Sequence, residues 1–129
     1  MDQDRPSPSV LVVEDEMFVR IVAVDACSDS GLRPYEARDA AEALDVLQAH
    51  PEISLVFTDI NMPGDMTGLD LVRQVHQDCP QMELIVTSGQ QHVQECDLPD
   101  HGSFLAKPYR QGDLIALIRK KLGLLGRVA

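Results

Sequence analysis

The chain has 129 residues, which is enough for one compact domain and too few for two of ordinary size. Its 21 acidic and 11 basic residues give a formal charge of −10. That balance argues against nucleic acid or an anionic membrane as a direct ligand, since both require a basic surface. No apolar run reaches the roughly 20 residues of a spanning helix and no secretory signal is visible, so we expect a cytoplasmic protein. Cys27, Cys79 and Cys96 stand at irregular spacings and are expected to be reduced thiols rather than disulfide or zinc ligands.

The first third of the chain alternates between apolar runs and helical periods. Residues 1–8 are expected to form a loose tail, and the continuous apolar run at 10–13 predicts a parallel strand buried on both faces. A helix is predicted over 17–30, with its apolar face formed by Val19, Val22, Ala23, Ala26 and Cys27. A strand is expected at 33–37, where Pro34 would be tolerated only at the start of the strand or at an edge of the sheet, because it cannot donate a ladder hydrogen bond.

A second helix and a central strand follow. Asp39 is expected to cap this helix, with Glu42 three residues further on, and His50-Pro51 should end it. Residues 53–58 read as a buried strand that ends at Asp59.

The second half of the chain repeats the same alternation. After a loop rich in Pro and Gly, a helix is predicted with the apolar face Leu71, Val72, Val75 and Cys79. Strands are expected at 82–87 and 103–106, and a last helix with the apolar face Leu114, Leu117, Ile118 and Leu122. Residues 90–101 contain few apolar anchors, so a helix there should be short and the most mobile part of the domain.

Five strand–helix repeats predict an α/β fold: a doubly wound parallel sheet with helices on both faces. Sites in such folds lie beyond the carboxyl ends of the strands, and there the sequence has Glu14, Asp15, Asp59, Ser88 and Lys107. Two carboxylates at about 4 Å repel by about 4 kcal/mol at an effective dielectric near 20. Three carboxylates with one lysine therefore favour a bound divalent cation, and hard oxygen ligands suit Mg²⁺.

Each of these residues has an ordinary explanation by itself. The acidic pair could be the first turn of a helix, Asp59 a loop aspartate, Ser88 part of a turn and Lys107 a surface lysine. Their occurrence together, in this order and each after its own strand, is far less expected by chance. The combination therefore points to a metal-dependent phosphoryl site.

Four segments carry a resemblance to a known family. They are VLVVEDE (10–16), LVFTDINMPG (55–64), LIVTSG (84–89) and FLAKPY (104–109). Together they resemble the receiver domain of two-component response regulators, over essentially the whole chain. The resemblance implies a five-stranded, flavodoxin-like sheet of order 2-1-3-4-5, with a receiver domain at 9–125 between tails at 1–8 and 126–129.

The resemblance also implies a role for each site residue. Asp59 would accept a phosphoryl group from a sensor histidine kinase or a histidine phosphotransfer protein, forming an acyl phosphate. Asp15, Asp59 and the backbone carbonyl of Asn61 would bind Mg²⁺ directly, and Glu14 would act mostly through a metal-bound water. Lys107 would pair with a phosphoryl oxygen.

The resemblance implies two further pairs of residues, one for the conformational switch and one for the lifetime of the acyl phosphate. By the resemblance, Ser88 would hydrogen-bond the phosphoryl group once it is present, and Phe104 would turn inward when Ser88 moves. Asn61 and Gln90 would flank the path of the hydrolytic water. Both are amides that can orient water without repelling the phosphoryl charge, so we expect an acyl phosphate that lasts seconds to minutes.

The sequence departs from the commonest family pattern in four places. Glu14 replaces an Asp, Phe104 replaces the Tyr of some members, and the loop between Asp59 and Gly68 is one residue longer than usual. The weak segment at 90–101 is the fourth departure, and it disfavours a dimer through that region. The unphosphorylated protein is therefore expected to be mainly monomeric.

The resemblance implies a stand-alone regulator rather than an enzyme, since its only catalysis would be its own phosphorylation and dephosphorylation. No output domain is apparent, so the signal would pass by conformational switching to an unknown protein target or by phosphorelay. Two alternatives stay open. One is a Mg²⁺-dependent phosphohydrolase, disfavoured because position 61 is Asn and there is no room for a cap; the other is a receiver-like module that docks without phosphorylation.

Overall fold

The computed structural model describes residues 7–89, 94 and 97–124. Their elements are β1 (Ser9–Val13), α1 (Met17–Asp29), β2 (Arg33–Ala37), α2 (Ala40–Ala49), β3 (Ile53–Asp59), α3 (Gly68–Asp78), β4 (Glu83–Ser88), β5 (Gly102–Ala106) and α4 (Gln111–Lys121). All neighbouring strands pair in parallel, in the order β2-β1-β3-β4-β5. The predicted fold class and strand order are confirmed.

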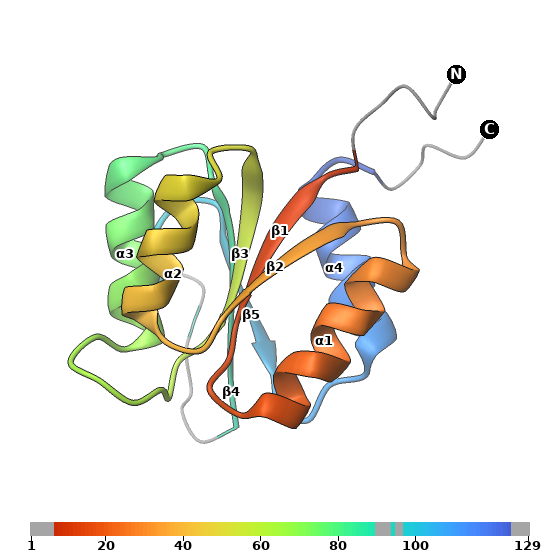
Figure 1. Cartoon of the computed structure of the whole chain (residues 1–129), viewed down its shortest axis with the longest axis horizontal. Helices are drawn as coiled ribbons and strands as arrows, with labels where there is room; N and C mark the ends of the chain where they lie inside the picture. Colours follow the sequence, from red (N-terminus) through yellow and green to blue (C-terminus); the bar gives the residue numbers. More distant parts are fainter. Residues whose placement is uncertain (1–6, 90–93, 95–96, 125–129) are drawn as a thin grey trace.

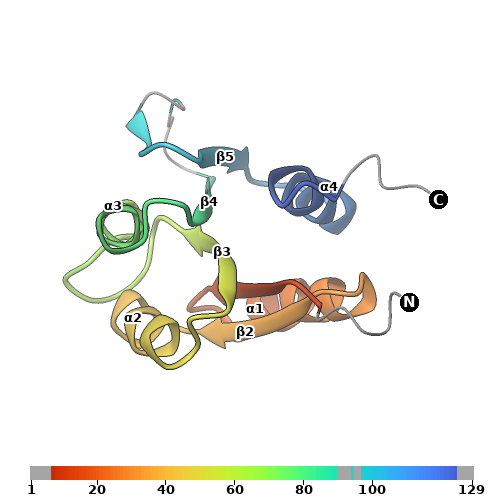
Figure 2. The same ribbon diagram turned by 90° about the horizontal axis from the view of Figure 1, so that it is seen from above.

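The sheet separates two helical layers. Helices α2 and α3 cover one face and α1 and α4 cover the other (Figures 1 and 2), so the buried apolar side chains form two clusters, one on each face. The apolar run of β1 is completely buried between these layers, as expected of a central parallel strand. No helix in the described part of the chain has the length and apolar character needed to cross a membrane.

The register of the strands places their carboxyl ends along one edge of the sheet. Val13, the last residue of β1, lies opposite Thr58 of β3. Ser88, the last residue of β4, lies opposite Ala106 of β5. Side chains that follow these strands therefore come out beside one another, at the lower edge in Figure 1.

Side-chain caps begin two of the helices. The carboxylate of Asp39 accepts a hydrogen bond from the Glu42 N–H at 2.8 Å, as predicted for the start of α2. The Glu42 carboxylate accepts from the N–H of Arg38, one residue before the cap. Thr67 and Asp70 form a reciprocal capping box at the start of α3, a signal that the sequence analysis did not use.

Two predicted core positions were wrong. Val22 of α1 is 48% exposed, because the buried stripe of the helix runs through Ala23 and Cys27 and Val22 lies to one side of it. Cys79 was assigned to the buried face of α3, but the helix ends at Asp78 and Cys79 is exposed. In both cases the spacing was compatible with burial, and the rotation or length of the helix decided against it.

The expectations for residues 90–101 fall mostly outside the described residues. Residues 90–93 and 95–96, which include Cys96, are not described; of the described neighbours, Asp97 has 3-10 helical geometry, and no α-helix occurs at 94 or at 97–101. The short or mobile helix expected there stays a prediction.

Candidate functional site

Three carboxylates meet where β1 and β3 end. Glu14 and Asp15 follow β1, and Asp59 is the last residue of β3. Each contributes an oxygen that lies within 4.8 Å of the other two. Glu14 and Asp59 are buried, whereas Asp15 is exposed and faces the solvent side of the cluster. The fold thus creates a compact group of hard oxygen ligands of the kind that binds divalent cations.

Lys107 is the cation of this cluster. Its Nζ donates a hydrogen bond to Asp59 Oδ2 at 2.7 Å and lies 3.7 Å from Glu14 Oε1. Burial lowers the pKa of Lys107, but the hydrogen bond to Asp59 and the charges of both carboxylates outweigh burial and raise it. The ammonium therefore stays charged beside Asp59.

The pKa of the Glu14 carboxylic acid is shifted by its surroundings. Burial, together with the nearby charge of Asp59, raises the pKa of Glu14 to about 7, although the Glu16 N–H and Lys107 both favour its ionised form. Near neutral pH the cluster is therefore less negative than three ionised carboxylates would be. In the absence of added positive charge, Glu14 ionises fully only above about pH 7.

The loop after β3 orients the Asp59 carboxylate. The Asn61 N–H donates to Asp59 Oδ1 at 3.1 Å, while Lys107 holds Oδ2. The Asn61 side-chain Nδ2 donates to Ser88 Oγ at 3.4 Å, and Ser88 itself is buried at the end of β4. Both oxygens of Asp59 are thus held, and the loop is tied to the neighbouring strand.

The sequence profile described as "Response regulator receiver domain" matches residues 10–119. The chain belongs to this family. The receiver protein CpdR of Brucella abortus (strain 2308) is 31% identical over 116 residues, which span 88% of this chain and 95% of that protein. The sensor kinase CckA of the same strain is 32% identical over 122 residues, which span 90% of this chain and only 13% of the kinase.

Solved structures support the same family. The response regulator receiver protein from Pseudomonas putida is 32% identical, with a TM-score of 0.79 over 90% of this chain and 98% of that one. A receiver protein from Sinorhizobium medicae WSM419 has a TM-score of 0.83 over 91% of this chain and 95% of that one. The Sinorhizobium medicae protein is only 23% identical to this chain, so that similarity shows the fold alone.

One predicted site residue of this receiver domain lies on β5, outside the carboxylate cluster, and another falls outside the described residues. Phe104 of β5 is half-buried, lies opposite Val86 in the sheet and packs against the core cluster on the α2–α3 face. Gln90, expected to flank the hydrolytic water, lies outside the described residues. Its expected role stays a prediction.

Arg20 is a contributor that the sequence analysis missed. From the end of the first turn of α1, its Nη1 donates to the backbone carbonyl of Glu14 at 2.8 Å, and its Nε donates to Glu36 Oε1 of β2 at 2.9 Å. The Glu14 N–H donates in turn to the carbonyl of Ala37. These contacts fix the backbone that carries the acidic pair. Arg20 and Glu36 are 16 residues apart in the sequence, so no local sequence pattern predicts that they pair.

Gly68 is a second missed contributor. A Cβ atom built on Gly68 would lie 2.1 Å from the backbone oxygen of Asp59, so no larger residue fits without movement. The Gly68 N–H also donates to the carbonyl of Ile60 at 2.9 Å. The start of α3 therefore packs directly on the strand end that carries Asp59. The sequence analysis treated this glycine only as part of a loop.

An exposed apolar surface begins directly beside the site. In the part of the chain that the structure describes, the large apolar side chains that are exposed all lie on the first two turns of α1: Met17, Phe18, Ile21 and Val22. We call this surface the α1 patch. Phe18 is 79% exposed, three residues after Asp15. Such a patch is typical of a surface that contacts a partner.

Proposed function

We propose that this receiver domain accepts a phosphoryl group on Asp59 from the phosphohistidine of a sensor histidine kinase or of a histidine phosphotransfer protein. The observation that carries the proposal is the position of Asp59, buried at a strand end, with Lys107 at 2.7 Å and two further carboxylates beside it. A nucleophilic carboxylate needs a cation to offset repulsion from the incoming phosphoryl group, and this cluster supplies one.

The transfer forms a bond between phosphorus and an oxygen of Asp59 and breaks the bond between phosphorus and a nitrogen of the donor. A carboxylate oxygen of Asp59 attacks the phosphorus, the P–N bond to the donor imidazole breaks, and its electron pair stays on the imidazole nitrogen. Asn61 and Lys107 hold the carboxylate in place before attack. Lys107, already charged, would then pair with a phosphoryl oxygen of the acyl phosphate.

The cluster fits Mg²⁺ as the resident cation. The ligands would be the carboxylates of Asp15 and Asp59 and the backbone carbonyl of Asn61, with Glu14 acting through a bound water. The fit rests on hard oxygens within 4.8 Å of one another and on the excess of three carboxylates over the single ammonium of Lys107. Bound Mg²⁺ would supply charge neutralisation between these carboxylates and the phosphoryl oxygens. We expect weak binding before phosphorylation and tighter binding after it.

Phosphorylation would be transmitted through Ser88 and Phe104. The Ser88 hydroxyl, now accepting from Asn61, would donate to a phosphoryl oxygen and pull the end of β4 toward Asp59. Phe104, on the adjacent strand, would turn inward to fill the space. The altered surface would then contact a downstream protein.

The test is phosphorylation with acetyl phosphate and Mg²⁺, followed by intact-mass measurement. Wild-type protein should gain one phosphoryl group, and Asp59→Asn should gain none because an amide forms no acyl phosphate. Asp65→Asn, an exposed aspartate of the same loop, is the matched control and should behave as wild type. No incorporation by wild type would support the docking module, and sustained multiple turnover of a phosphate ester would support the phosphohydrolase.

The α1 patch is the expected contact for the phosphohistidine donor. The donor must bring its imidazole to Asp59, so its surface covers the rim of the site where Phe18 and Ile21 are exposed. The double variant Phe18→Ser, Ile21→Ser should lower transfer from phosphorylated kinases by about 10-fold or more, since each buried side chain contributes about 1.5–3 kcal/mol. Phosphorylation by acetyl phosphate should stay unchanged.

The experiment first tests a panel of phosphorylated histidine kinases on the wild-type protein. The kinases that transfer to it are then used to compare the double variant with the wild type. Asp25→Asn, an exposed substitution on the same helix outside the α1 patch, serves as control. Equal transfer rates for the double variant and the wild type would assign the donor contact to another surface.

A further inference from the structure

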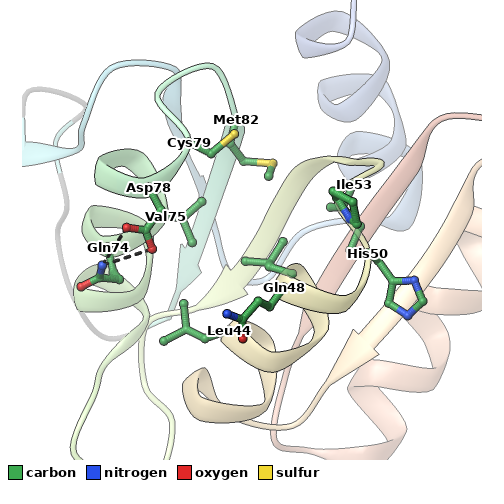
Figure 3. Close-up of a pocket in the computed structure, with 11 residues that line it drawn as sticks. Leu44, Gln48, His50, Ile53, Gln74, Val75, Asp78, Cys79 and Met82 are labelled. Atoms are coloured by element: carbon green, nitrogen blue, oxygen red, sulfur yellow. Dashed lines mark hydrogen bonds between the residues drawn. The ribbon is translucent and has the colours of Figure 1, made fainter.

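A cavity lies at the edge of the sheet opposite the phosphorylation site. Its volume is about 520 Å³, and it opens between the carboxyl-terminal ends of α2 and α3 (Figure 3). The residues around it include His50 after α2, Cys79 after α3, Ile53 at the start of β3 and Met82 before β4. It therefore shares no residue with the carboxylate cluster.

The packing of α2 explains the cavity. This helix buries only the small residues Ala40 and Ala43 against the sheet, both near its beginning. Leu44 and Leu47, further along, remain half-buried and line the cavity with Val75 of α3. Figure 3 shows side chains from both helices around the same space. The interior is thus mainly apolar, and the apolar surface there is incompletely covered by the protein itself.

The rim of the cavity is negative. Gln74 Nε2 lies 3.2 Å from both oxygens of Asp78 and so holds this carboxylate at the rim (Figure 3). The carboxyl-terminal ends of α2 and α3 both border the opening, and neither helix has a Lys or Arg in its last turn. Their terminal carbonyls therefore add partial negative charge that no lysine or arginine of either last turn offsets. The basic groups nearby are His76 on α3 and His50, which pairs with Glu52 at 3.4 Å.

We propose that this cavity binds a small organic cation, with a primary ammonium or guanidinium group joined to an alkyl or aryl body. The apolar body would cover Leu44, Leu47 and Val75, and the cation would lie against Asp78 and the helix ends. The volume is within the range of about 300–1,000 Å³ that holds small ligands in proteins. Such a ligand would give the domain a second input, separate from phosphorylation.

The probes are three molecules of similar body and different charge: phenethylamine, 2-phenylethanol and phenylacetate. Binding is followed by methyl NMR on the full chain, reading Leu47, Val75 and Met82. The amine should give saturable shifts at these methyl groups, and the alcohol should bind about fivefold or more weakly because it lacks the charge. The carboxylate should not bind. Equal affinities for the amine and the alcohol, or shifts confined to the edge near Asp59, would overturn the proposal.

Two variants sharpen the result. Asp78→Asn should lower the affinity for the amine toward that for the alcohol, because only the helix ends would then face the cation. Asp65→Asn, on a distant loop, should change neither affinity. An unchanged amine affinity in Asp78→Asn would overturn the proposal. In a Cys96→Ser background, a bulky disulfide reagent on the exposed Cys79 should block amine binding. Cys27 should not react, because burial raises the pKa of its thiol to about 11. Persistent amine shifts after Cys79 is blocked would also overturn it.

A last experiment distinguishes a free small ligand from a side chain of a partner protein as the occupant of the cavity. A short peptide with one lysine between two leucines should bind no more tightly than phenethylamine. Much tighter binding of the peptide would assign the cavity to a partner's side chain and overturn the small-ligand proposal. All measurements use unphosphorylated protein, so their outcome does not depend on whether Asp59 accepts a phosphoryl group.

Discussion

Asp15→Ala is expected to lower the rate of Mg²⁺-dependent phosphorylation of Asp59 by about 100-fold or more. Asp15 is the exposed member of the three-carboxylate cluster and the one that can meet an entering cation directly. Without Asp15 the proposed Mg²⁺ would bind more weakly. Glu14 and Asp59 would then have only Lys107 as counter-charge, so Asp59 would attack an anionic phosphoryl group against repulsion that the metal no longer offsets. The measurement is the initial rate with acetyl phosphate across a range of Mg²⁺ concentrations.

Glu16→Ala is the matched control for this variant. Glu16 is exposed in the same turn but outside the cluster, and its contact with Glu14 uses only its backbone N–H, which the substitution keeps. It should be phosphorylated like the wild type. The proposed metal role is wrong if Asp15→Ala matches the wild-type rate, or if wild-type protein reacts equally fast in EDTA and in Mg²⁺.

Glu14→Gln is expected to stabilise the metal-free protein at alkaline pH and to have little effect in acid. Burial raises the pKa of Glu14 from 4.5 to about 7 on folding. Its ionisation therefore opposes folding, and the stability of the wild type falls as pH rises from 4.5 through about 7. Glutamine, which does not ionise, avoids a cost of up to about 3 kcal/mol at about pH 8.

Urea unfolding in EDTA, at about pH 5 and about pH 8, measures this difference. The free energies of unfolding of Glu14→Gln and wild type should agree in acid and diverge in base. Glu42→Gln, a substitution on the surface of α2, should show no such divergence. A stability difference that does not change with pH would mean that Glu14 is not held partly protonated by the fold.

The same protonation links Mg²⁺ affinity to pH. Only ionised Glu14 assists the cation, so the affinity of the wild type should increase as pH rises through about 7 and then level off. In Glu14→Gln this increase should largely disappear. Isothermal titration in two buffers of different ionisation enthalpy would show proton release on binding to the wild type alone.

The order of elements and the positions of the key side chains were accessible from the sequence. A continuous apolar run such as 10–13, followed by charged residues, marks both a buried parallel strand and its end. Because parallel strands end at a common edge, the sequence also indicated that Glu14, Asp15 and Asp59 would meet. These features depend on local pattern and on the general rules of the fold, so they need no knowledge of helix orientation.

Only the tertiary structure decided how those groups act on one another. The 2.7 Å contact between Lys107 and Asp59 joins residues 48 apart, and the support of Glu14 by Arg20 depends on how α1 is rotated against β2. The pKa of Glu14 follows from burial, which no spacing specifies. The exposure of Val22 and the cavity beside α2 have the same origin: the angle and distance at which each helix packs on the sheet are set by all its contacts together, not by its own sequence.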